Sequence, residues 1–118
     1  MAAHNDLGKK GELLAQEWLL QHGYELIHKN WRYARSEVDI IATKESVLHF
    51  IEVKARTTSS FGFPEESITE KKIQNLMIAG EEFLYRFPEW KRIQYNVLSI
   101  YIGSSQDVEY FFIEDVYI

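Results

Sequence analysis

Residues 36–56 read SEVDIIATKESVLHFIEVKAR, and the fold of the chain depends most on this stretch. Two largely apolar segments, residues 37–43 and 47–55, lie on either side of a polar segment at 44–46. This pattern predicts two β-strands joined by a hairpin turn. The second segment is apolar enough for a strand in the interior of a sheet.

Four charged side chains interrupt the apolar pattern of this hairpin. Glu37 and Asp39 alternate on the first strand, and Glu52 and Lys54 alternate on the second. Side chains two residues apart on a strand point the same way, about 6.5 Å from each other. In an antiparallel hairpin the numbers of opposed residues sum to a constant, and a sum of 89 or 91 puts all four charges on one face. An even sum would separate Asp39 from Glu52 unless a bulge intervened.

Two carboxylates on opposed strands repel each other unless a proton or a cation lies between them. Their oxygen atoms suit a hard divalent cation, so the hairpin predicts an Mg²⁺ or Mn²⁺ site built on Asp39 and Glu52. A plain alternative is that Glu52 and Lys54 form an exposed ion pair at an edge. Glu37 is better explained as a salt-bridge or hydrogen-bond partner than as a metal ligand.

The flanking segments predict two helices, at residues 6–22 and 69–86. Asn5 is the expected N-cap of the first helix and Gly23 the residue after its end, while Ser67 or Thr69 caps the second. Three more strands are predicted at residues 24–33, 92–102 and 108–113. The order α-β-β-β-α-β-β indicates an α/β fold with helices packed on a central mixed sheet, in a single domain over residues 1–118.

The first helix carries two further signals. Gly8 and Gly11 lie on its apolar arc, where a missing side chain lets another element approach closely. The arc ends at Glu12, which would place that carboxylate at the edge of the packed face, leaning over the sheet.

Composition limits the classes of function. The 118 residues include no cysteine, which excludes disulfides, thiolate zinc sites and a cysteine nucleophile. The net charge of −5 comes entirely from residues 61–118 and excludes a basic protein that coats DNA. Nucleic acid would therefore bind locally, or with metal ions offsetting the carboxylates. No apolar run approaches the roughly 20 residues that span a bilayer, so we expect a soluble cytoplasmic protein without a membrane partner.

Asp39, twelve intervening residues and then Glu52-Val53-Lys54 match the D…(D/E)-x-K pattern. Further motifs, spread over most of the chain, are Gly8…Gly11-Glu12…Ala15, Gly23-Tyr24, Asn30-Trp31-Arg32, residues 37–42 and 50–56, Phe61-Gly62 and Lys71-Lys72. Together they resemble the YraN-like family of small bacterial proteins and, more distantly, the PD-(D/E)XK nuclease superfamily.

This resemblance implies a restriction-endonuclease-like core, nearest in shape to archaeal Holliday-junction resolvases. It implies a nuclease dependent on Mg²⁺ or Mn²⁺ that hydrolyses phosphodiester bonds in DNA, with branched and single-stranded DNA as the candidate forms. Carried over by position, Asp39 and Glu52 bind the metal, Glu12 completes the site, and Lys54 orients or activates the attacking water. The Val53 carbonyl would be an additional metal ligand.

The chain departs from the pattern at three positions. Val38 replaces the proline of the superfamily motif, and Ser36 replaces a glycine usual in the closer family. Asn96 replaces an aspartate of the family, which would remove a charge if that aspartate helped to bind metal or to anchor a helix. The Asn96 departure and the net charge of −5 favour a second hypothesis, in which the nuclease fold is a non-catalytic module that binds nucleic acid or a protein partner. A weaker third one is an assembly protein that uses its acidic C-terminal half.

Several residues are candidates for contact with nucleic acid. Three arginines flank the proposed site and two lysines begin the second helix: Arg32, Arg35, Arg56, Lys71 and Lys72. The simpler interpretation of the two lysines is a solvated helical turn. A resolvase-like role would favour a homodimer with two-fold symmetry. The aromatic residues at 110–112 and Tyr117 could form such an interface, although a core strand explains residues 110–112 nearly as well.

Overall fold

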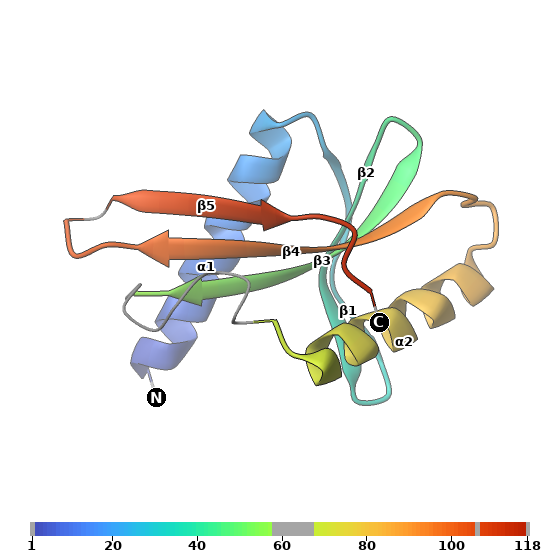
Figure 1. The fold of residues 1–118 in the computed structure, drawn as a ribbon, viewed down its shortest axis with the longest axis horizontal. Helices are drawn as coiled ribbons and strands as arrows, with labels where there is room; N and C mark the ends of the chain where they lie inside the picture. Colours follow the sequence, from blue (N-terminus) through green and yellow to red (C-terminus); the bar gives the residue numbers. More distant parts are fainter. Residues whose placement is uncertain (1, 58–67, 106, 118) are drawn as a thin grey trace.

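The computed structural model describes residues 2–57, 68–105 and 107–117, with the side chains of residues 2–5 excepted. The predicted order of elements is confirmed, and so is the mixed α/β class (Figure 1). The elements are α1 (Ala2–Gln21), β1 (Glu25–Tyr33), β2 (Ser36–Lys44), β3 (Val47–Arg56), α2 (Glu70–Arg86), β4 (Ile93–Ile102) and β5 (Val108–Ile113).

The five strands form one sheet in the order β1-β2-β3-β4-β5, which is also their order in the chain. Neighbouring strands are antiparallel except β3 and β4, which are parallel and connected through α2. Figure 1 shows α1 crossing behind β4 and β5, while α2 lies against the β1–β2 arm. Within the described residues, no helix has the length and hydropathy needed to cross a membrane.

Each face of the sheet has its own hydrophobic core. Ala15 and Leu19 of α1 pack with Ile40, Ile51 and Leu98 on one face. The other core includes residues of α2 and the sheet that face away from α1: Leu76, Phe83, Val38, Ile41 and Phe50. Alternation along β3 therefore sends Phe50, Glu52 and Lys54 toward the α2 face.

The ends of the two helices follow local sequence signals. After α1, Gly23 adopts a φ of 88°, its N–H donates to the Leu20 carbonyl, and the Tyr24 N–H donates to the Leu19 carbonyl. These two bonds form a Schellman motif, which confirms the predicted end. The start was predicted wrongly, because α1 begins at Ala2 and Asn5 lies inside it. Alanine has the highest helix propensity and extends the helix past the expected cap.

Thr69 is the N-cap of α2: its hydroxyl oxygen accepts a hydrogen bond from the Lys72 backbone N–H at 3.2 Å. This confirms one of the two caps predicted for the helix. The other, Ser67, lies outside the described residues, as does the Phe61-Gly62 motif. The cap fixes the first turn of α2 and with it the position of Lys72.

The β2–β3 hairpin has the odd register that the sequence required. Ile40 pairs with Ile51 and Ala42 with His49, so the residue numbers sum to 91. The turn consists of Glu45 and Ser46, both with positive φ, as a type I′ turn needs. The paired register runs only from the turn to Ile40 and Ile51.

Beyond that point β2 leaves β3 and continues with β1 alone. Asn30 of β1, opposite Asp39, has a φ of 54°, and register pairs flank it at Lys29–Ile40 and Trp31–Val38. The kink at this point rotates the strand, so that Val38 and Ile41 both face α2 although they are three residues apart. Asp39 therefore lies at a fork between β2 and β3.

Candidate functional site

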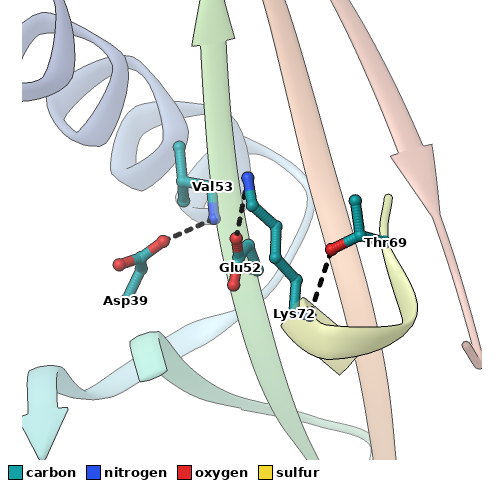
Figure 2. Close-up of polar contacts among 5 residues, drawn as sticks. All are labelled: Asp39, Glu52, Val53, Thr69 and Lys72. Carbon is teal, nitrogen blue, oxygen red and sulfur yellow. Dashed lines mark hydrogen bonds and ion pairs between the residues drawn. The ribbon is translucent and has the colours of Figure 1, made fainter. Parts of the chain in front are cut away.

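Asp39 bridges the fork in the sheet with its side chain. Its Oδ2 accepts a hydrogen bond from the backbone N–H of Val53, at 2.8 Å (Figure 2). The carboxylate thus replaces the backbone of β2 as the partner of β3 where the two strands diverge. This bond fixes Asp39 next to Glu52, as the hairpin register predicts.

A hollow of about 180 Å³ lies at this fork. Its lining combines acidic, basic and amide side chains from the β1–β2 turn, β2, β3 and α2: Arg35, Glu37, Asp39, Glu52, Lys72 and Asn75. A space of this size holds several water molecules or a hydrated cation. A second hollow of about 10 Å³, roughly the size of one water, lies beside it. Its lining combines three charged side chains with four apolar ones: Glu52, Lys54, Lys72, Ile68, Ile73, Leu76 and Val97.

The electrostatics of the acidic pair is unusual for carboxylates. Burial, together with the charges of the nearby Glu52, Glu37 and Glu12, raises the pKa of Asp39 to about 7, against the opposing effect of the Val53 N–H. Burial also raises the pKa of Glu52, whereas the charges of Lys72 and Lys54 lower it. Negative charge is therefore concentrated around Asp39, where a cation would stabilise the ionised form.

Two lysines approach Glu52 from different elements. Lys54 lies on the same strand and face, and Lys72 reaches from the first turn of α2, with its Nζ 3.7 Å from Oε2 of Glu52 (Figure 2). Hydrogen bonding with the Lys72 side chain lowers the pKa of Lys54, and burial and the Lys72 charge lower it further. Glu52 alone acts in the opposite direction. A single carboxylate thus serves as the counter-charge of two ammonium groups.

Glu12 comes near the site because α1 lies directly on β3. A Cβ added at Gly11 would be 2.6 Å from the Cβ of Ala55, a distance that only glycine permits. The predicted close approach is therefore confirmed at Gly11. It was wrong at Gly8, where a Cβ would meet nothing within 4 Å. Glu12 is half-buried, and its charge contributes to the raised pKa of Asp39.

The donor set around the fork fits a hard divalent cation. Among the residues that the structure describes, no three His, Asp or Glu side chains converge on one point. Mg²⁺ commonly binds through one or two carboxylates and fills its remaining positions with water and substrate phosphates. Asp39 and Glu52 supply two carboxylates at this hollow, and their binding of such an ion stays a prediction. The roles of Glu12 and of the Val53 carbonyl as ligands stay predictions.

The basic residues predicted to contact nucleic acid are placed differently from one another. Arg35, in the turn between β1 and β2, lines the larger hollow, as does Lys72. Arg32 pairs with Glu37 at 3.6 Å, so Glu37 forms the salt bridge predicted for it. Lys71 is exposed and does not line either hollow.

Arg56 extends the row of charged residues along β3, on the same face as Glu52 and Lys54. Its Nε is buried without a hydrogen-bond partner in the described part of the chain.

Sequence reasoning missed two features of the site: Asn75, which lines the larger hollow, and the contact between Lys72 and Glu52. The signal for Asn75 was its spacing of three residues from Lys72, which puts both on one side of α2.

Asn96 lies on the opposite face of the sheet from Glu52 and Lys54. It is fully buried, its Nδ2 is 2.8 Å from His49 Nδ1, and its Oδ1 accepts from the Asp115 backbone N–H at 3.0 Å. Its side chain therefore fixes the segment after β5 to the sheet. Because position 96 faces away from Glu52 and Lys54, an asparagine in place of the family's aspartate removes no charge from the acidic site. His49 likewise packs on the face opposite Glu52.

The aromatic residues considered for a dimer interface divide between core and surface. Tyr110 stacks on Trp18 on the α1 face, and Phe112 packs tilted against the same ring, with centroid distances of 6.0 and 5.1 Å. Trp31 packs edge-on against Phe83 in the other core, at 5.5 Å. Tyr117 is 71% exposed.

Comparison with known proteins identifies the family of this chain. The model of the uncharacterised protein family UPF0102 matches residues 11–100. A UPF0102 protein of Flavobacterium johnsoniae is 41% identical over 93% of this chain and 94% of its own length. Those of Flavobacterium psychrophilum and Phocaeicola vulgatus are 40% and 35% identical, over 86% and 85% of this chain and 85% and 83% of their own lengths. The chain therefore belongs to the UPF0102 family, which confirms the resemblance to YraN-like proteins.

Proposed function

We propose that this protein is a nuclease of the PD-(D/E)XK type that hydrolyses phosphodiester bonds in DNA with Mg²⁺ or Mn²⁺. One observation supports this above all. Asp39 and Glu52 come from diverging strands to one hollow, and Lys54 lies on the same strand face as Glu52. A core would gain nothing from two adjacent half-buried carboxylates, because each one raises the cost of ionising the other.

Each residue has a distinct task in this proposal. The metal would supply Lewis acidity toward a phosphoryl oxygen and a lower pKa for bound water. Asp39 is held by the Val53 N–H and keeps its carboxylate aimed into the hollow. Glu52 provides the second carboxylate. Lys54 stands beside the small hollow and can donate to the attacking water or to the developing oxyanion.

DNA would approach through the larger hollow, where Arg35 lies at the mouth formed by the β1–β2 turn. Its guanidinium can bind a phosphate oxygen by paired hydrogen bonds. Branched, single-stranded and duplex DNA are the substrates to compare. A homodimer with two such sites would suit a branched substrate, and the expected compartment is the cytoplasm.

The test is a titration of wild type and Asp39→Asn with Mn²⁺ by calorimetry, followed by cleavage assays on the three forms of DNA. Asparagine keeps the acceptor for the Val53 N–H but loses the charge, so this variant should fold. We expect wild type to bind Mn²⁺ and to cleave at least one form, and both properties to disappear in Asp39→Asn. Lys54→Ala should keep the metal and lose cleavage.

Other outcomes would redirect the proposal. Cleavage that persists in both purified variants would contradict these catalytic roles. Binding of DNA without metal binding or cleavage would instead identify a non-catalytic module on this fold.

A further inference from the structure

Charge in the candidate site is separated into two unbalanced halves. On one side Asp39, Glu37 and Glu52 line the larger hollow together, and of these Glu37 also pairs with Arg32. On the other side Lys54 and Lys72 share the single carboxylate of Glu52. A cation beside Asp39 and an anion beside the two lysines would balance both halves at once.

Lys72 is positioned for two alternative partners. Its backbone is fixed by the Thr69 cap, whereas its side chain is long and 38% exposed. The Nζ–Oε2 separation of 3.7 Å marks a loose ion pair, and the Glu52 side chain is less exposed, at 22%. Lys72 lines both hollows, so rotation about the bonds of its long side chain can carry the ammonium from Glu52 into open space. Figure 2 shows this side chain reaching across from α2 to the carboxylate on β3.

We propose that Lys72 is an exchangeable counter-ion of this site: it pairs with Glu52 in the metal-free protein and pairs with a phosphate oxygen of nucleic acid once metal is bound. The inference rests on the proposed function and deepens it. In the metal-free state Lys72 occupies the place beside Glu52 that a divalent cation needs. With metal present, the same ammonium would be repelled from Glu52 toward the substrate.

This exchange makes metal and Lys72 compete for Glu52. Removing the charge of Lys72 should therefore raise the affinity for metal and lower the affinity for DNA. An ordinary structural salt bridge would behave differently, because its loss would leave metal affinity unchanged or would reduce it by disturbing the fold. The opposite signs of the two effects identify the exchange.

The experiment compares wild type, Lys72→Met, Lys72→Arg and the neighbouring control Lys71→Met. Mn²⁺ affinity is measured by calorimetry at about pH 8, where Asp39 is ionised. We expect Lys72→Met to bind Mn²⁺ roughly tenfold more tightly than wild type, since a nearby positive charge is gone. Lys72→Arg and Lys71→Met should stay within about twofold of wild type, because each keeps a charge at position 72.

A second measurement follows DNA affinity with Ca²⁺ and with a chelator. Wild type should bind DNA more tightly with Ca²⁺, and Lys72→Met should lose much of that gain. Circular dichroism and thermal melting verify that each variant is folded.

Equal Mn²⁺ affinities of wild type and Lys72→Met would overturn this inference, and so would a full Ca²⁺-dependent gain in the variant. Both results leave the proposed function standing. Absence of Mn²⁺ binding by wild type would overturn the proposed function and the inference with it.

Discussion

Asp39 has two structural tasks that conflict. It completes the hydrogen bonding of β3 through the Val53 N–H, which favours a charged carboxylate. Burial and the neighbouring acids oppose that charge and bring its pKa to about 7. A residue under such opposing effects stores free energy that a bound cation can release.

This conflict predicts how stability depends on pH. The folded pKa of Asp39, about 7, lies above the unfolded value of 3.8, so the folded state holds a proton that the unfolded state has lost. Metal-free wild type should therefore lose stability as pH rises from about 4 to 7, by at most about 1.4 kcal/mol for each pH unit. Asp39→Asn lacks this loss and should exceed wild type by about 2–4 kcal/mol at pH 8.

Urea denaturation at about pH 5 and 8, with a chelator present, measures this difference. Glu109→Gln is the matched control, because Glu109 is an exposed carboxylate on β5. If the free energy of unfolding changes by the same amount in wild type and Asp39→Asn between these two pH values, a raised Asp39 pKa is contradicted.

At the scale of elements, Gly11 decides how closely α1 can lie on β3. Gly11→Ala would force a Cβ to within 2.6 Å of the Ala55 Cβ, so the helix must move away. We expect a loss of about 1–3 kcal/mol in the free energy of unfolding. Mn²⁺ affinity should also fall, because Glu12 moves with the helix.

Gly8→Ala is the control for this prediction, since the space around Gly8 is open. It should stabilise the protein by up to about 1 kcal/mol through helix propensity. Thermal melting of the two variants gives the comparison, and equal effects would show that packing against Ala55 is unimportant.

Local signals in the sequence were sufficient to predict most elements. Alternation and the polar segment at 44–46 predicted the hairpin but left its register open, and the structure selects the sum of 91. Thr69 was among the predicted caps. The fork at Asp39 was not predictable, because it depends on a left-handed Asn30 in the neighbouring strand. The pairing of Lys72 with Glu52 depends on how α2 docks, which no local pattern records.

At the scale of the whole molecule, a net charge of −5 works against binding nucleic acid. Any affinity must come from the few basic groups near the fork, helped by metal ions that offset Asp39 and Glu52. DNA affinity should therefore rise at least about tenfold when Ca²⁺ replaces a chelator.

Arg35→Ala tests the local part of this argument. In the presence of Ca²⁺ the variant should bind DNA several-fold more weakly. The slope of log affinity against log salt concentration should fall by about one, as expected for the loss of one phosphate contact. Lys91→Ala is the control, because Lys91 is exposed and lies outside both hollows. Fluorescence anisotropy over a range of salt concentrations measures both quantities. Equal losses in the two variants would mean that the fork does not direct binding.

The sheet order β1-β2-β3-β4-β5 repeats the order in the chain, and this has a kinetic consequence. The hairpins of β1, β2 and β3 close over two-residue turns, a step of about 1–10 μs in isolated hairpins. The parallel pairing of β3 with β4 must wait until residues 57–92 have closed a much longer loop. During folding, Asp39 and Glu52 are therefore expected to come together before α2 docks on the sheet and brings Lys72 next to Glu52.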